Sequence, residues 1–346
     1  MLLAFETSCD ETSAAAIHRG RVLANVVSSQ VRMHAEYGGV VPELAAREHL
    51  RNLPEVGRAA LAEAGVPANA LEAIAATQGP GLPGALLVGF RAAQGMAFAL
   101  RLPFLGIHHH EAHLYSPWIQ GEPPVSSLDQ FEPNVSLVVS GGHTLLVHMT
   151  ETTKFRLLGS TLDDAAGECF DKIGKMLGLA YPAGAEVDRL ASEGNPRAFA
   201  FPRPMLNEPH DDFSFSGLKT SVRYFLRDHP GLAEEPAGVR DLCASVQAAI
   251  VEVLATKTIR AARRCSVTCV TASGGVTCNR GLRDALAAAC SQAGLTLRLA
   301  QRAFCTDNAG MIGIVAEHKL HRGCARTPLG EEIRPAWEIE ETVGTP

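Results

Sequence analysis

The feature that most constrains the fold is a pattern of short apolar strands and polar turns that occurs twice. The first set lies at the N-terminus, at Leu2–Glu6, Ser13–His18 and Arg21–Ser28. The second set lies at Val135–Ser140, Leu145–Met149 and Phe155–Ser160. Such runs, separated by turns, are typical of a β-meander, and their recurrence indicates a duplicated fold. We therefore expect two related lobes with a cleft between them.

Helical periodicity follows each set of strands. The predicted helices are Val41–Ala64, Gly84–Leu100, Ala237–Arg264 and Asn279–Ala293, and one further strand is predicted at Val267–Ala272. Pro54 should break or restart the first helix, because proline removes a backbone donor and clashes with the preceding turn. Strands mixed with helices in two repeats predict an α/β architecture.

The boundary between the lobes is predicted from Gly121–Asn134, a stretch rich in Pro, Ser and acidic residues that is typical of a linker. It divides the chain into an N-terminal lobe at residues 1–125 and a C-terminal lobe at residues 126–346, with the last helix free to pack back on the first lobe. A chain of 346 residues is long enough for two such lobes.

The composition is that of an ordinary folded protein, with 46% hydrophobic and 20% charged residues. No run reaches the roughly 20 apolar residues of a membrane span, and the N-terminus lacks the basic segment of a signal peptide. The nine cysteines contain no CxxC pair and are expected to be reduced thiols. We therefore expect a cytoplasmic protein. The net charge of −6 does not by itself predict a nucleic-acid partner.

A cluster of histidines is the first candidate for a metal site. His109 and His113 are four residues apart, so a helix would place both imidazoles on one face. The zincin motif HExxH is not met, because Leu114 stands three residues after Glu111. Asp307 lies between a predicted strand and a helix-like run, where a carboxylate either caps the helix or binds a cation.

Two glycine turns each follow a predicted strand, at Ser140-Gly141-Gly142-His143 and Ser273-Gly274-Gly275-Val276. Their backbone amides could hold phosphate oxygens, because glycine allows close approach of an anion. Neither turn is a Walker loop. Several carboxylates could bind ribose hydroxyls or a magnesium ion or act as a general base, although any one of them is more often only solvated; these are Asp10, Glu11, Asp171 and Asp188.

Taken in order, these motifs resemble the bacterial branch of the TsaD (Gcp) family. The strings that carry the resemblance are Glu6–Thr12, Val41–His49, Gly79–Leu82, His108–His113, Val138–Thr144, Phe170–Lys172, Phe213–Lys219, Gly274–Val276 with Asn279–Arg280, and Cys305–Asn308. Two positions depart from the family pattern: Leu145 stands in place of the usual Gln, and Ala183 in place of a Gly. Both departures leave the expected contact residues in place.

The resemblance implies an actin-like ATPase (ASKHA) fold with two RNase H-like lobes. It implies one divalent metal ion, with Fe2+ favoured over Zn2+, held by His109, His113 and Asp307. It also implies that ATP or threonylcarbamoyl-AMP binds at a set of residues in the C-terminal lobe. These are Val138, Val139, Ser140, Gly141, Gly142, Asp171, Gly184, Asp188 and Asn279.

The activity implied by the resemblance is transfer of a threonylcarbamoyl group to N6 of adenosine 37, in tRNAs that read codons beginning with A. The implied partners are tRNA, TsaB and TsaE, with a separate synthase that makes the adenylate. Asp10 or Glu11 is expected to accept the amine proton or bind a cation. The alternatives are a metalloprotease, the older name of the family, an ASKHA-type phosphotransferase and a non-enzymatic scaffold.

Overall fold

The computed structural model describes residues 1–324 and 326–342, and these divide into two compact units. Unit 1 comprises Met1–Phe131 and the C-terminal segment that starts at Thr306, and unit 2 comprises Glu132–Cys305. The division after Phe131 lies six residues beyond the predicted one and still within the predicted linker. The C-terminal segment returns to unit 1 because its helix α10 (Ala309–His321) packs against the central strands of that unit.

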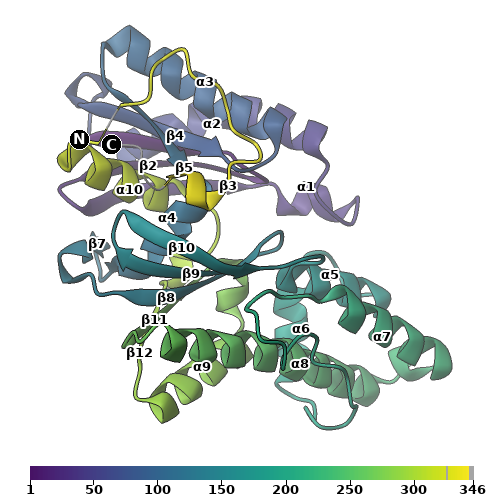
Figure 1. The fold of residues 1–346 in the computed structure, drawn as a ribbon. Helices are drawn as coiled ribbons and strands as arrows, with labels where there is room; N and C mark the ends of the chain where they lie inside the picture. Colours follow the sequence, from purple (N-terminus) through teal and green to yellow (C-terminus); the bar gives the residue numbers. More distant parts are fainter. Residues whose placement is uncertain (325, 343–346) are drawn as a thin grey trace. The chain divides into compact units, whose positions relative to one another are not determined.

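Unit 1 is built on a seven-stranded sheet in the order β5-β4-β1-β2-β3-β7-β6. Its strands are β1 (Leu2–Glu6), β2 (Glu11–His18), β3 (Arg21–Ser29), β4 (Ala73–Gly79), β5 (Phe104–His108), β6 (Ile119–Gln120) and β7 (Val125–Ser126). Its helices are α1 (Val31–Ala35), α2 (Pro42–Glu63), α3 (Pro83–Leu100), α4 (His109–Tyr115) and α10 (Ala309–His321). Within this unit, α2 and α3 cover one face of the sheet and α10 the other (Figure 1).

Strand β1 is apolar from Leu2 to Phe5 because helices bury both of its faces. Leu3 and Phe5 belong to the hydrophobic cluster formed with α2 and α3. Ala4 faces α10, where a side chain at Gly313 would contact it. A strand covered on both sides shows no polar alternation, which explains why the sequence reads as one apolar run up to Glu6.

Unit 2 contains a five-stranded sheet in the order β10-β9-β8-β11-β12. Its strands are β8 (Asn134–Val139), β9 (Thr144–Glu151), β10 (Lys154–Ser160), β11 (Cys269–Ser273) and β12 (Thr296–Leu299). Its helices are α5 (Ala166–Met176), α6 (Gly184–Ala191), α7 (Ser216–Asp228), α8 (Pro236–Arg264) and α9 (Arg280–Ala293).

The two units share one topology, which confirms the predicted duplication. In each unit the first three strands form an antiparallel meander, β1-β2-β3 in unit 1 and β8-β9-β10 in unit 2. Two further strands then add in parallel beside the first strand, β4 and β5 in unit 1 and β11 and β12 in unit 2.

The prediction that Pro54 would break the first long helix is wrong. Helix α2 runs without interruption from Pro42 to Glu63, with Pro54 inside it. Leu53 and Val56 on either side of the proline are buried against the core of unit 1. Tertiary packing of this apolar face outweighs the missing hydrogen bond, as it commonly does for helices in proteins.

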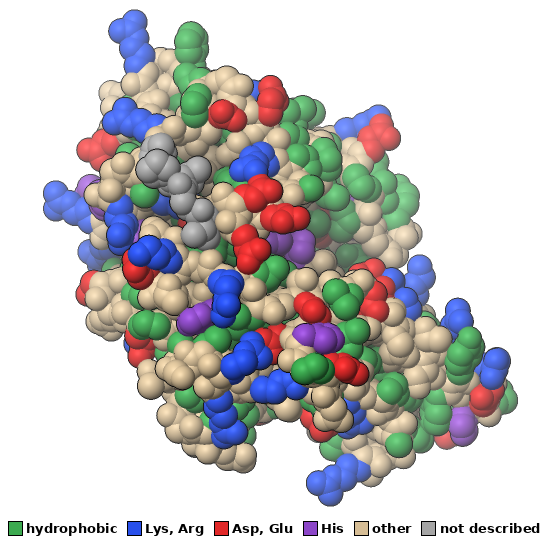
Figure 2. All heavy atoms as spheres, viewed as in Figure 1, with side chains coloured by type: hydrophobic (Ala, Val, Ile, Leu, Met, Phe, Trp, Pro, Cys, Tyr) green, Lys and Arg blue, Asp and Glu red, His purple; other side chains and the backbone are tan. Residues whose placement is uncertain are grey.

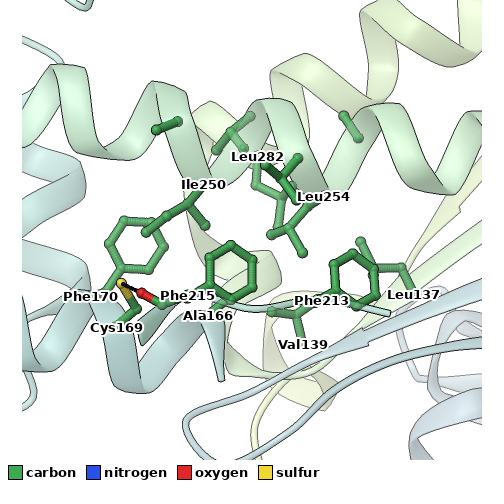
Figure 3. Packing of buried hydrophobic residues seen from close by; sticks show 14 of the residues in the cluster. Leu137, Val139, Ala166, Cys169, Phe170, Phe213, Phe215, Ile250, Leu254 and Leu282 are labelled. Atoms are coloured by element: carbon green, nitrogen blue, oxygen red, sulfur yellow. Dashed lines mark hydrogen bonds between the residues drawn. The ribbon is translucent and has the colours of Figure 1, made fainter. Parts of the chain in front are cut away.

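The core of unit 2 lies between its sheet and helix α8 (Figure 3). Phe213 and Phe215 are completely buried there, beside Ile250 and Leu254 of α8. Burial of each phenylalanine side chain contributes about 1.5–3 kcal/mol relative to exposure. Helix α8 is long and apolar enough to cross a membrane by length and composition alone, but 78% of its most apolar window is buried inside the protein. That burial is typical of a helix at the centre of a folded domain.

Candidate metal centre and turn cluster

The metal centre begins where β5 ends and α4 starts. The imidazole of His108 accepts a hydrogen bond from the backbone N–H of Glu111 at 3.3 Å and so caps the new helix. One helical turn separates His109 from His113, and their ring centroids lie 4.8 Å apart. The predicted pairing of these two imidazoles on one helix face is therefore confirmed.

Asp307 lies against both imidazoles. Its Oδ1 is 3.1 Å from Nε2 of His113 and 3.4 Å from Nε2 of His109. The three side chains offer ligand atoms that all lie within 4.8 Å of one another, the one such group found among residues 1–324 and 326–342. Two imidazoles and a carboxylate form the ligand set of many iron and zinc enzymes, which leaves positions open for substrate. The residues present thus fit a divalent metal ion.

The helix that follows Asp307 is capped by the next residue and not by Asp307 itself. Asn308 is the N-cap of α10, and its Oδ1 accepts a hydrogen bond from the backbone N–H of Met311 at 3.0 Å. Asp307 is 21% exposed, whereas the side chains of His109 and His113 are almost fully buried. The carboxylate is therefore the solvent-facing member of the cluster.

Opposite charges dominate the electrostatics of this cluster. Burial alone would lower the pKa of His109, but the carboxylates of Asp307 and Glu6 raise it to about 10. Burial would raise the pKa of Asp307, yet His109 and His113 hold it well below its usual range. The pKa of His113 is lowered, mainly by burial. The two carboxylates hold a proton on His109, and binding of a cation at the cluster would release that proton.

Glu6 is a member of the site for which the sequence analysis gave no role. It is fully buried, and its Oε2 lies 3.0 Å from Nδ1 of His109, on the side of the ring away from Asp307. One indication of this role was present in the sequence: a carboxylate ends an apolar strand, and a charge buried there needs a specific partner.

Asp10 and Glu11 follow β1 in the turn before β2. Burial, together with the charge of Asp307, raises the pKa of Asp10. Burial and the charge of Asp10 raise the pKa of Glu11 to about 8, although its Oε1 accepts a hydrogen bond from Ser29 at 3.0 Å. The charge of Asp307 therefore acts on both predicted catalytic carboxylates.

Glu111 makes its ion pair outside the cluster. Its side chain is buried and forms an ion pair of 2.7 Å with Lys319 of α10. This contact joins the helix that carries the histidines to the helix that follows Asp307. Because Glu111 is engaged there, the carboxylate base that a metalloprotease needs beside its metal-bound water is not supplied by this residue.

The glycine turns of unit 2 meet at one edge of its sheet. Strands β8 and β11 are parallel neighbours in a register that pairs Val138 with Ser273, so the turns that follow them lie side by side. Gly141 and Gly142 are exposed, and a Cβ added to either would meet nothing within 4 Å. Their backbone is thus accessible to a ligand, as expected for the predicted nucleotide-binding turn.

Of the remaining predicted substrate residues, Gly184 and Asn279 lie at helix starts, whereas Asp171 and Asp188 lie within helices and contact the start of another helix. Asp171 of α5 accepts hydrogen bonds from the backbone N–H groups of Ala183, at 2.7 Å, and Gly184, at 3.2 Å. Burial raises the pKa of Asp171. Asp188 of α6 accepts from the backbone N–H of Arg280 at 3.1 Å, and Asn279 is the N-cap of α9. Both aspartates therefore fix local backbone, a function that the sequence analysis did not predict for them.

Substitution of Gly274 with alanine is expected to destabilise unit 2. Gly274 has a φ of 92°, in the left-handed region, and an added Cβ would clash with the backbone carbonyl of Val139 at the end of strand β8. We expect a loss of about 1–3 kcal/mol, because both strain and a backbone clash arise. Chemical denaturation measures it, with Gly142→Ala as the control, since that position has open space. Equal stability of the two variants would contradict the prediction.

Comparison with known proteins identifies the family. A family model described as TsaD, tRNA N6-adenosine threonylcarbamoyltransferase, matches residues 21–314. The chain belongs to the TsaD family. Its relatives of that name include one from Syntrophotalea carbinolica, 46% identical over 99% of this chain and 97% of the relative. Another, from Chlorobium chlorochromatii, is 49% identical over 93% of each.

Solved structures show that this TsaD chain has the actin-like ATPase (ASKHA) fold. HypF from T. kodakarensis matches with a TM-score of 0.62 and 15% identity, over 93% of this chain and 48% of HypF. Component A of (R)-2-hydroxyglutaryl-CoA dehydratase from Acidaminococcus fermentans matches with a TM-score of 0.52 and 15% identity, over 92% and 97%. At this identity the likeness concerns the fold alone, and it agrees with the duplicated topology.

Proposed function

We propose that this chain transfers a threonylcarbamoyl group from threonylcarbamoyl-AMP to N6 of adenosine 37 in tRNAs that read codons beginning with A. The observation that carries the proposal is the match, over nearly the full length, to bacterial relatives named for this transfer. The cluster of His109, His113 and Asp307 supports it, because the geometry fits a divalent ion, either Fe2+ or Zn2+.

The chemistry requires an exocyclic amine, a poor nucleophile, to attack a carbamoyl carbon from which AMP departs. A bound divalent metal would supply Lewis-acid polarisation of the carbamoyl oxygen. The residues of the protein otherwise position the two reactants and stabilise the charge that develops during transfer. The exposed amides of Gly141 and Gly142 would hold the phosphate of the adenylate. Asp171 and Asp188 fix the backbone around the glycine turns, and Asp171, which accepts both of its backbone bonds through Oδ1, would offer Oδ2 to a ribose hydroxyl.

Glu11 is the better candidate for the proton acceptor. The attacking amine loses a proton as the new bond forms, and a base is most effective when its pKa lies near the working pH. The pKa of about 8 for Glu11 meets that condition. Asp10, beside it, contributes the charge that raises the pKa of Glu11.

Substitution of Asp10 with alanine is expected to lower transfer while sparing adenylate binding. The proposed adenylate contacts lie in unit 2, whereas Asp10 belongs to unit 1 and acts through the charge around Glu11. A loss of roughly 100-fold or more in transfer is in the range for disturbing a general base. Single-turnover transfer and calorimetric titration with a stable adenylate analogue measure the two quantities. Unchanged transfer would remove Asp10 from the mechanism.

The partners proposed are tRNA, TsaB, TsaE and a separate adenylate-forming synthase, all acting in the cytoplasm. On the face drawn in Figure 2, Lys and Arg side chains are interspersed with acidic ones. The net charge of −6 favours tRNA recognition through local contacts and partner surfaces over binding driven by a broad excess of positive charge.

The decisive experiment is reconstitution. Purified chain is incubated with labelled threonine, bicarbonate, ATP, the adenylate-forming enzyme, TsaB, TsaE and tRNA. We expect label on the tRNA, released as modified adenosine after nuclease digestion, and none on a tRNA with guanosine at position 37. Absence of label, when the same components are active with another TsaD family member, would overturn the proposal.

A further inference from the structure

Glu6 is not one of the three residues assigned to the metal, but its carboxylate contacts one of them. Glu6 ends β1 and is completely buried, so its carboxylate must be satisfied by protein donors. The backbone N–H of Ser8 donates to Oε1. The hydroxyl of Thr77, on β4, donates to Oε2 at 2.6 Å. Nδ1 of His109 approaches the same Oε2 at 3.0 Å.

This arrangement determines which nitrogen of His109 carries the proton. A carboxylate only accepts hydrogen bonds, so the ring nitrogen that faces it must be the N–H. Nδ1 is therefore protonated, and the nitrogen left to bind a cation, in the Nδ1–H tautomer of the neutral ring, is Nε2, which faces Oδ1 of Asp307 at 3.4 Å. Only this tautomer presents a lone pair to a cation at the cluster.

We propose that Glu6 is the positioning residue that sets the Nδ1–H tautomer and ring orientation of His109, and thereby the metal affinity of the site. The inference rests on the proposed metal-dependent function. A hydrogen bond to the second nitrogen of a metal-binding histidine orients the ring and makes it a better ligand, and loss of such a partner typically costs 10–100-fold in affinity.

Glutamine at this position would reverse the hydrogen bonding without changing the shape. The Ser8 N–H is a fixed backbone donor, so the amide oxygen must take the place of Oε1. The amide NH2 then occupies the place of Oε2 and donates toward Thr77 and His109. The hydroxyl of Thr77 can rotate to accept. His109 can accept only through a deprotonated Nδ1, which moves its proton to Nε2 and removes the lone pair from the metal site.

The test compares Zn2+ affinity, measured by competition with a chromogenic chelator, among wild type, Glu6→Gln and Glu317→Gln. Glu317 is a matched control, because it too is a buried carboxylate of unit 1, but it accepts from the backbone N–H groups of Arg19, at 2.7 Å, and Gly20, at 2.5 Å. We expect 10–100-fold weaker binding for Glu6→Gln and wild-type affinity for Glu317→Gln. A folded Glu6→Gln protein with wild-type affinity would overturn the inference.

A second measurement does not depend on the variant folding. Long-range 1H–15N NMR of the Zn2+-loaded wild-type protein distinguishes the protonated from the metal-bound ring nitrogen of His109. We expect the proton at Nδ1 and the metal at Nε2, and the opposite assignment would overturn the inference. A His113→Ala variant tests the site itself: if it retains wild-type Zn2+ affinity, the metal centre fails as a whole, whereas weaker binding by His113→Ala with normal binding by Glu6→Gln refutes the role of Glu6 alone.

Discussion

Replacement of Asp307 with asparagine is expected to remove bound metal and to reduce threonylcarbamoyl transfer by at least about 100-fold. Loss of a residue that only orients a ligand already costs 10–100-fold, and Asp307 touches both imidazoles of the cluster directly. Asparagine keeps the size of the side chain but removes the negative charge that a divalent ion requires. Metal content after dialysis and single-turnover transfer measure the two losses.

The control for this variant is the neighbouring position. Asn308→Ala removes the N-cap hydrogen bond to Met311 and should cost about 1 kcal/mol of stability, while metal affinity remains that of the wild type. Asp307→Asn should instead lose the metal, in addition to the stability lost with its pairs to His109 and His113. If both variants retain metal, the site is not the one described above.

Substitution of Lys319 with methionine is expected to cause the largest loss of stability. Its partner, Glu111, has a side chain only 2% exposed, so removal of the ammonium leaves a buried charge without its counterion. Breaking a buried pair in this way costs about 3–5 kcal/mol, which corresponds to a decrease of roughly 10 °C in Tm for a domain of this size. Thermal unfolding followed by circular dichroism measures the change.

Two further variants test whether the loss of stability comes from the unpaired buried charge of Glu111. Arg47→Met breaks the exposed pair between Arg47 and Glu43, 2.6 Å long, and should leave Tm unchanged, because exposed pairs contribute little. The double variant Lys319→Met, Glu111→Leu removes both charges and should recover most of the lost stability. A Lys319→Met protein as stable as Arg47→Met would show that the buried pair does not stabilise unit 1.

The fold could be predicted from the sequence where burial produces a simple pattern. The meanders β1-β2-β3 and β8-β9-β10 were predicted because their strands are short apolar runs bounded by turns. Strand β4 was not predicted, because Ala73–Gly79 contains small residues with little β-propensity and becomes a strand by pairing in parallel with β1. Helix α7 was missed for a related reason, since its polar sequence buries only Leu218 and Val222.

By itself, the sequence determined the duplicated architecture and the pairing of His109 with His113, because helical geometry brings residues four apart onto one face. Residue spacing left Asp307 open between capping a helix and binding a cation. Only the tertiary structure brings it to the two imidazoles, gives the capping role to Asn308, and places Glu6 behind the ring of His109. The physical reason is that spacing along a helix is a local property, encoded in neighbouring residues. The meeting of β1, α4 and the start of α10 depends instead on the burial of apolar faces far apart in the chain.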